Sequence, residues 1–201
     1  MVVVAPQFTT STQIYQLGGM IRQGVVKDPQ DWTINIVSRI SDWARKETGI
    51  TQYYLIGHSA GAQFLSRVAA FLPTEARRIV IANPSTHVLP TLDVKAPYGL
   101  GGIYPRATEE VQLRRYLEQP VTIYLGESDV GEDDDDLNVG PDAMAQGKTR
   151  FERGMKAFND GRELAGSRGW TFNWRLVRAP GVGHSARAMF SAPAASEALR
   201  P

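Results

Sequence analysis

The chain has 201 residues, of which 42% are hydrophobic and 21% charged, and its formal net charge is +1. This composition is typical of a globular protein and excludes a disordered chain, and the length is enough to bury a sizeable core in one domain over residues 1–201. The near-neutral charge gives no electrostatic reason to expect nucleic acid as a partner. The absence of cysteine excludes disulfides, thiolate metal sites and a cysteine nucleophile.

The sequence contains no apolar run that approaches the length of a membrane-spanning helix. Its first residues, MVVVAPQF, lack a basic region and reach Pro6 early, which is not typical of a signal peptide. We therefore expect no membrane span, and a cytoplasmic location is favoured. A signal encoded further upstream would not be visible in this sequence.

The first third of the chain contains one predicted strand and one predicted helix. The β-branched run Val2–Ala5, ended by a proline, predicts a buried strand, and residues 7–24 are interpreted mostly as loop. In residues 31–47 the apolar side chains recur at spacings of three and four, which predicts a helix capped by Asp31.

Further along, short apolar runs alternate with helical patterns. We expect strands at 52–56, 78–82, 121–125 and 172–177, helices at 60–72, 109–117, 149–166 and from 185 onward, and long loops at 85–105 and 126–140. Such alternation predicts an α/β fold with a mostly parallel sheet covered by helices on both faces.

The stretch Gly57-His58-Ser59-Ala60-Gly61 lies between a predicted strand and a predicted helix, and it fits the pattern G-x-S-x-G. In this pattern the serine occupies a tight, strained turn, and the glycines avoid a clash between the helix and the strand. The helix that starts at Ala60 directs its N–H groups and the positive end of its dipole toward the serine oxygen, where an oxyanion needs support. The pattern therefore favours Ser59 as a nucleophile; the alternative is that Ser59 only caps the helix.

A serine nucleophile in this arrangement needs an acid after a later strand and then a histidine after the last strand. Asp129 stands just beyond the strand at 121–125, where the ligand-facing residues of a parallel sheet lie. Glu127 is the second choice, and the run Glu132–Asp136 offers rival acids that we expect to be solvated. His184 follows the last predicted strand on a glycine-rich turn, so it fits the order.

The two other histidines fit less well. His58 adjoins Ser59, and we expect the chain direction to point its side chain away from the serine. His87 lies between the serine and the acid, which is the wrong order. His184 is therefore the predicted base.

The acidic run and a pair of arginines each allow more than one interpretation. The acidic run Glu132–Asp136 suits a hard cation such as calcium, but it lacks the spacing and central glycine of an EF-hand loop, so a solvated loop is favoured. Arg150 and Arg153 stand one turn apart on a predicted helix. We expect them to face solvent or the acidic loop, and contact with an acidic group of a substrate is the alternative.

The motifs GHSAG at 57–61, GESD at 126–129 and GVGH at 181–184 resemble those of the α/β-hydrolase superfamily, most closely its small cutinase, lipase and polyester-depolymerase-like members. The resemblance implies a minimal fold that starts at the superfamily's third strand, here Val2–Ala5. It also implies a catalytic triad of Ser59, His184 and Asp129, with oxyanion N–H groups from Ala60 and Phe8. Neither a cofactor nor a metal is implied.

The expected function is therefore that of a serine esterase, which cleaves a small-molecule or polymeric carboxylic ester through an acyl-enzyme. A thioesterase or amidase would use the same residues, and a non-catalytic binding protein of the same fold is the alternative from a different class. Acyl and alcohol specificity and the oligomeric state do not follow from the sequence.

Overall fold

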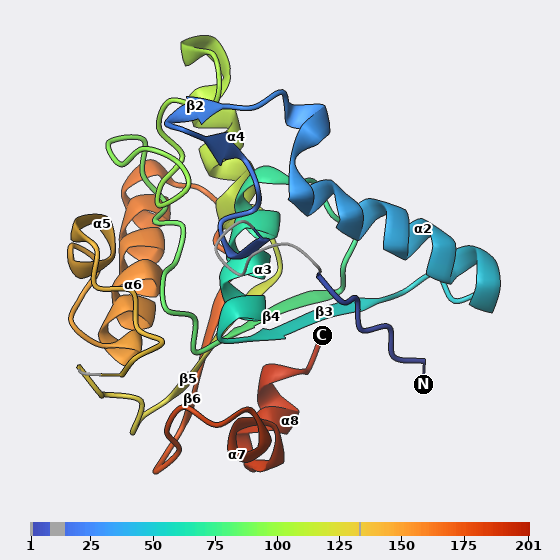
Figure 1. Ribbon diagram of the computed structural model, residues 1–201, viewed down its shortest axis with the longest axis vertical. Helices are drawn as coiled ribbons and strands as arrows, with labels where there is room; N and C mark the ends of the chain where they lie inside the picture. The colour runs from blue at the N-terminus through green and yellow to red at the C-terminus, as the bar shows by residue number, and fades with distance from the viewer. Residues whose placement is uncertain (1, 9–14, 133) are drawn as a thin grey trace.

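The computed structural model describes residues 2–8, 15–132 and 134–201. Within these residues, the centre of the fold is a parallel sheet of four strands in the order β3-β4-β5-β6 (Figure 1). The strands are β3 (Tyr54–His58), β4 (Arg78–Ala82), β5 (Val121–Gly126) and β6 (Arg175–Ala179). Because each strand is parallel to the next and joined to it by a helical crossover, the predicted α/β architecture is confirmed.

Helices cover both faces of this sheet (Figure 1). One face carries α3 (Ala60–Phe71), α4 (Arg106–Glu118) and α6 (Arg150–Arg168), with α2 (Ile36–Thr48) beside α3. The other face carries α7 (Ala186–Ser191) and α8 (Ala194–Ala198). Across the described ranges, no helix is both long and apolar enough to cross a bilayer.

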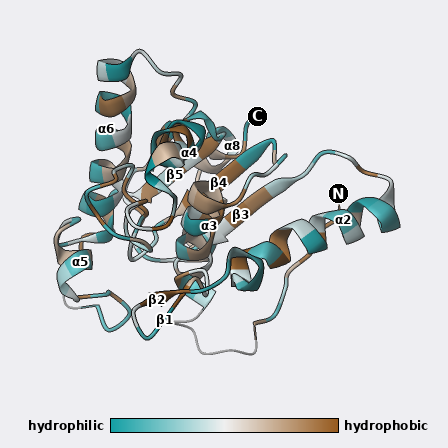
Figure 2. Cartoon of the chain, turned by 90° about the horizontal axis from the view of Figure 1, so that it is seen from above, coloured by the Kyte–Doolittle hydropathy of each residue, from teal (hydrophilic) through white to brown (hydrophobic). Residues whose placement is uncertain are grey.

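The strands divide their side chains between two cores. In β4, Ile79 and Ile81 join the core under α3, α4 and α6, while Val80 and Ala82 join the smaller core under α7 and α8. This follows from the alternation of side chains along a strand. Since both faces are buried, the strands are nearly continuous apolar runs, which Figure 2 shows as brown at the centre of the molecule.

The segment before the sheet differs from the prediction. The end of the segment predicted as loop and the two residues after it form a small antiparallel hairpin, β1 (Ile21–Arg22) and β2 (Val25–Val26). Two short 3-10 turns, η1 (Pro29–Asp31) and η2 (Thr33–Asn35), precede α2. The helix therefore begins at Ile36, and the prediction that Asp31 caps it is wrong; Asp28 instead accepts a hydrogen bond within η1.

A short helix, α5 (Pro141–Met144), follows the acidic loop and leads into α6. The loop at 85–105 is irregular, as predicted, apart from a single bridge between Lys95 and Gly101. This loop lies against α6, because Leu89, Thr91 and Val94 line the same surface hollow as residues of that helix.

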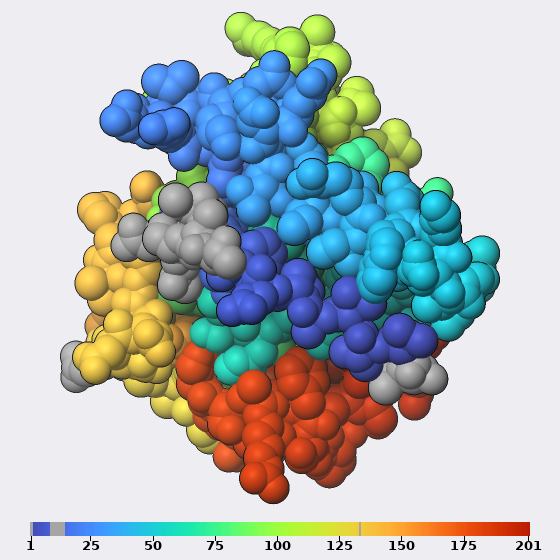
Figure 3. All heavy atoms as spheres, turned by 45° about the vertical axis from the view of Figure 1, so that its right-hand side comes forward, coloured from blue at the N-terminus to red at the C-terminus, as the bar shows by residue number. Residues whose placement is uncertain are grey.

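The prediction of a buried strand at Val2–Ala5 is wrong. These residues belong to no strand, and the side chains of Val2, Val3 and Val4 are 57%, 75% and 40% exposed. Figure 3 shows this segment in dark blue on the surface, between α2 and the C-terminal helices. β-branched residues favour a strand only where a neighbouring strand supplies hydrogen bonds and packing. The described sheet therefore begins at β3, the strand that leads into Ser59.

Candidate active site

Ser59 occupies a one-residue turn between β3 and α3. Its backbone has φ 52° and ψ −117°, a conformation that costs a non-glycine residue about 1–3 kcal/mol and that the surroundings must enforce. The Ser59 N–H donates to the carbonyl of Ala82 at 3.0 Å, and the Ser59 carbonyl accepts from the N–H of Gln63 at 2.9 Å. These two bonds tie the turn to β4 and to the first turn of α3.

The hydroxyl of Ser59 does not cap the helix. No N–H group of α3 donates to its Oγ atom, which lies 3.0 Å from Nε2 of His184. The interpretation of Ser59 as a mere helix cap is therefore wrong. The hydroxyl instead stands clear of the sheet and faces a basic nitrogen.

The two glycines beside Ser59 have different roles. A Cβ atom on Gly57 would lie 2.6 Å from the carbonyl oxygen of Gly61, so only glycine lets α3 approach β3 this closely. A Cβ atom on Gly61 would meet no heavy atom within 4 Å. The predicted steric reason for glycine is confirmed at Gly57 and is wrong at Gly61.

Asp129 and His184 come from the turns that follow β5 and β6. The Nδ1 atom of His184 lies 2.8 Å from Oδ2 of Asp129, whose side chain is only 3% exposed. The carboxyl ends of parallel strands share one edge of a sheet, so the ends of β3, β5 and β6 bring Ser59, Asp129 and His184 together. Glu127, the second choice for the acid, instead pairs with Arg178 at 3.4 Å.

Asn83, which the sequence did not single out as a site residue, connects these turns. It follows β4, is buried, and has a positive φ of 46°. Its Oδ1 accepts from the N–H of Gly126 at 2.9 Å, and its Nδ2 donates to the carbonyl of Gly183 at 3.4 Å. Asparagine is one of the few residues that adopt positive φ, so the Asn-Pro pair after a predicted strand was the available signal.

The side chain of His58 does not point away from the site as predicted. Its ring centroid lies 4.8 Å from that of His184. Burial, followed by the charge of His184, lowers the pKa of His58 to about 4, so this ring is neutral near pH 7. It therefore packs against the predicted base as an uncharged group.

His87 is buried among polar side chains. Its backbone N–H and carbonyl are both hydrogen-bonded to the side-chain amide of Gln146, each at 2.9 Å. Burial, with the charges of Arg67 and Arg153, lowers the pKa of His87 to about 3. The residue therefore remains neutral in the folded protein at working pH.

Arg150 and Arg153, in the first turn of α6, are both fully buried, so the prediction of solvent exposure is wrong. The prediction also allowed contact with the acidic loop, and this part is confirmed for Arg150, whose Nη1 lies 2.5 Å from Oδ2 of Asp134. The same atom lies 3.5 Å from Oδ1 of Asp129. Arg153 donates to the carbonyls of Ser85 and Gly147.

The two predicted oxyanion donors lie at the start of α3 and beside its second turn. The N–H of Ala60 is the first of the helix, and no described residue accepts a hydrogen bond from it. The ring of Phe8 stacks on Tyr15 at 4.5 Å between centroids and lies 5.2 Å from the ring of Phe64 on α3. Their role as donors stays a prediction.

No group of three His, Cys, Asp or Glu side chains that could hold a metal ion occurs in residues 2–8, 15–132 and 134–201. The described part of the acidic loop therefore gives no support to the calcium alternative. Asp133 lies outside the described residues.

A parallel sheet with a serine turn, an acid turn and a histidine turn that meet at one edge is the arrangement of the α/β-hydrolases. The alpha/beta hydrolase fold family matches residues 27–170, and the chain belongs to this family. Among solved structures, the chain is similar to poly(aspartic acid) hydrolase-1 from Sphingomonas sp. KT-1, with 32% identity and a TM-score of 0.82 over 90% of this chain and 69% of that one. It is also similar to LpqC, a poly(3-hydroxybutyrate) depolymerase from Bordetella parapertussis, with 30% identity and a TM-score of 0.80 over 94% and 68%. No curated protein matches the chain.

Proposed function

We propose that this protein is a serine hydrolase that cleaves carboxylic esters through an acyl-enzyme. Membership of the α/β-hydrolase family and similarity to two polymer hydrolases support a hydrolytic function. The observation that carries the finer proposal is the pair of contacts made by His184: 3.0 Å to Ser59 Oγ and 2.8 Å to Asp129 Oδ2. A nucleophile, a base and an orienting acid in contact are what acyl transfer requires.

In the proposed mechanism, Ser59 Oγ attacks the ester carbonyl while His184 Nε2 accepts the serine proton. Asp129 accepts a hydrogen bond from the Nδ1–H of His184, which fixes the tautomer and stabilises the imidazolium that forms. The imidazolium then protonates the departing alcohol. Water attacks the acyl-enzyme with His184 again as the base, which releases the acid and restores Ser59.

The negative oxygen of the tetrahedral intermediate needs donors beside Ser59. The N–H of Ala60, at the positive end of the α3 dipole, supplies one, and the N–H of Phe8 supplies the other. Loss of one such donor typically lowers kcat by about 10²–10³.

The charge around the site favours a neutral ester over an anionic polymer. Poly(aspartic acid), named for one similar protein, is a polyanion joined by amides, whereas poly(3-hydroxybutyrate) is a neutral polyester. The loop that pairs with Arg150 exposes the carboxylates of Glu132, Asp135 and Asp136, which would repel a polyanion. Amide hydrolysis is the second candidate, on the 32% identity to the poly(aspartic acid) hydrolase.

The test is hydrolysis of p-nitrophenyl esters, from acetate to longer acyl chains, by the wild type, Ser59→Ala and Ser167→Ala. Ser167 is exposed near the C-terminal end of α6 and serves as the matched control. We expect activity in the wild type and in Ser167→Ala, and its loss in Ser59→Ala. Oligomers of 3-hydroxybutyrate and of aspartate then compare a neutral ester with an anionic amide. Activity that survives in Ser59→Ala, or a folded wild type that hydrolyses no ester, would contradict the proposal.

A further inference from the structure

Arg150 lies at the N-terminus of α6, where a positively charged side chain is unfavourable. It is the first residue of α6, after Thr149, whose hydroxyl accepts from the N–H of Glu152. The N-terminus of a helix carries partial positive charge, so a guanidinium there is unfavourable while Glu152 is favourable. The Arg150 side chain is also fully buried, which removes the charge from water. The stability of α6 therefore does not explain this arginine, but its contacts do.

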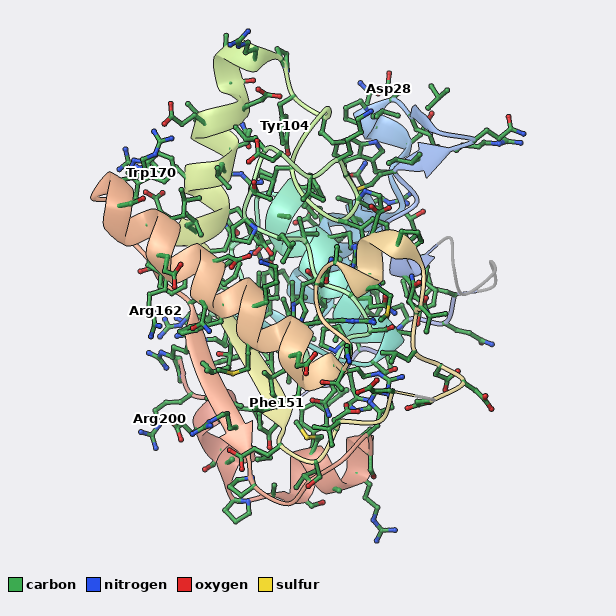
Figure 4. All side chains as sticks on the ribbon, turned by 90° about the vertical axis from the view of Figure 1, so that its left-hand side faces the viewer. Asp28, Tyr104, Phe151, Arg162, Trp170 and Arg200 are labelled. Atoms are coloured by element: carbon green, nitrogen blue, oxygen red, sulfur yellow. The ribbon has the colours of Figure 1, made fainter. Side chains whose placement is uncertain are left out.

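The start of α6 holds Asp129 at two points. Arg150 Nη1 lies 3.5 Å from Asp129 Oδ1, which is long for a hydrogen bond, so this attraction is mainly electrostatic. The N–H of the next residue, Phe151, donates to the carbonyl of Asp129 at 3.3 Å. Figure 4 shows Phe151 at this end of α6, near the end of β5. The other carboxylate oxygen of Asp129 remains directed at His184.

A second carboxylate fixes Arg150 in place. Asp134 Oδ2 accepts from Arg150 Nη1 at 2.5 Å, a short charge-assisted bond, and the Asp134 side chain is about one-third exposed. The hydrogen bond from Arg150 is the main cause that lowers the pKa of Asp134, so this carboxyl is ionised at any working pH. Arg150 thus sits between two carboxylates, one in the site and one in the acidic loop.

We propose that Arg150 is a positioning residue for Asp129, and that Asp134 balances the charge that Arg150 brings to the site. The inference rests on the proposed function, because it assigns a role in setting the geometry and charge state of His184. Arg150 holds Oδ1 of Asp129 so that Oδ2 keeps its contact with His184. The positive charge of Arg150 also weakens the stabilisation of the His184 imidazolium by Asp129. The negative charge of Asp134 reduces this effect.

Charged and titratable groups face His184 from four directions. They are His58 from β3, Asp129 after β5, Asp134 from the acidic loop and Arg150 from α6. His58 stays neutral above about pH 4, and Arg187 on α7 is exposed to solvent. Above that pH, the groups in this set whose charge differs between the variants below are Arg150 and Asp134.

This arrangement predicts opposite effects for two neutralising substitutions. Arg150→Gln removes a positive charge, so Asp129 holds the proton on His184 more strongly and the acid limb of kcat/KM moves to higher pH. Asp134→Asn removes the negative charge paired with Arg150, so Arg150 disfavours the protonated form of His184 more strongly. The acid limb therefore moves to lower pH. We expect shifts of about half a pH unit to one unit, which are modest beside those of directly paired charges. A merely structural role would not produce shifts of opposite sign.

The experiment measures kcat, KM and the pH profile of kcat/KM for the wild type, Arg150→Gln, Arg150→Lys, Asp134→Asn and Asp135→Asn. Asp135 is exposed on the same loop and is the control for the loss of one negative charge. We expect Arg150→Gln to lower kcat about 10- to 100-fold with little change in KM, which is the scale of loss when the hydrogen-bond partner of a metal-binding side chain is removed. Arg150→Lys should keep the wild-type pH profile and recover only part of kcat, because its single ammonium cannot reproduce the guanidinium geometry.

The rate at which a fluorophosphonate labels Ser59, measured over the same pH range, separates this inference from the proposed function. If the wild type hydrolyses no ester yet Ser59 is labelled, the proposed function fails and opposite shifts in labelling still support the role of Arg150. If Arg150→Gln does not fold, Asp134→Asn and Arg150→Lys decide the matter. Profiles of Asp134→Asn and Asp135→Asn that coincide, or a folded wild type whose Ser59 is never labelled, would overturn the inference.

Discussion

Gly57 and Gly61 lie so close together that a Cβ atom on Gly57 would stand 2.6 Å from the carbonyl oxygen of Gly61. This contact sets the distance between β3 and α3 and, with it, the position of Ser59. We expect Gly57→Ala to push the helix away from the strand and to lower the free energy of unfolding by about 1–3 kcal/mol, as overpacking does elsewhere. Because Ser59 moves with the helix, kcat should fall at least about tenfold, as positional errors near the chemistry do.

Gly61→Ala is the matched control, because its added Cβ would meet no heavy atom within 4 Å. In a helix this change raises stability by up to about 1 kcal/mol. Urea denaturation and hydrolysis of a p-nitrophenyl ester measure both variants. Equal destabilisation by the two substitutions would show that the close approach at Gly57 does not hold the turn.

Asp129 and Glu127 are two carboxylates on the same turn that the structure assigns to different partners. Asp129→Asn removes the acceptor for Nδ1–H of His184, and we expect kcat to fall by about 10⁴, the scale known for this substitution in Ser-His-Asp enzymes. Glu127→Gln breaks only the partly exposed pair with Arg178, so its kcat should stay within about twofold of the wild type. Steady-state kinetics on the same ester compares them. The reverse order of effects would make Glu127 the acid.

Asn83 combines a positive φ with hydrogen bonds to both turns that carry the acid and the histidine. Asn83→Ala leaves the N–H of Gly126 without its acceptor and forces alanine to adopt a left-handed backbone conformation. We therefore expect the free energy of unfolding to fall by about 2–4 kcal/mol. Asn83→Gly loses the same bonds but relieves the backbone, so it should be more stable than Asn83→Ala by about 1 kcal/mol. Urea denaturation tests this order, and identical stabilities would mean that the backbone conformation of Asn83 carries no strain.

The sequence predicted the parts of this site that depend on order along the chain. Ser59, Asp129 and His184 each follow a strand, and parallel strands end at one edge, so order alone was enough to bring them together. The strand at 78–82 was predicted at its observed bounds because an apolar run buried on both faces is clearly delimited by polar residues. The single domain over residues 1–201 and the cytoplasmic location stay predictions.

The parts that the sequence did not predict depend on packing between distant segments. Val2–Ala5 has strand-forming residues but no strand beside it, and no local pattern reports that. The direction of the His58 ring depends on the distant turn that carries His184. The burial of Arg150 depends on the acidic loop, whose Asp134 lies 16 residues before it. Periodicity describes one element at a time, so contacts of this kind become visible only in the folded chain.

His87 should make the stability of the protein depend on pH. Its pKa is lowered to about 3 in the folded state, first by burial and then by Arg67 and Arg153, against about 6.5 for an ordinary histidine in the unfolded chain. Between about pH 3 and about pH 6.5, His87 is therefore protonated in the unfolded chain but neutral in the folded protein. The free energy of unfolding therefore decreases as pH falls below about 6.5, by at most about 1.4 kcal/mol per pH unit for this residue.

We expect His87→Leu to flatten that dependence. The substitution removes the titrating ring but leaves the backbone N–H and carbonyl that bond to Gln146. His58, whose pKa is lowered to about 4, acts in the same direction and remains in the variant, so the slope should decrease without vanishing. Urea denaturation of the wild type and the variant from pH 7.5 to pH 4.5 measures both slopes. Parallel curves would mean that the folded protein accepts a proton on His87 as readily as the unfolded chain does, which its buried position beside Arg67 and Arg153 argues against.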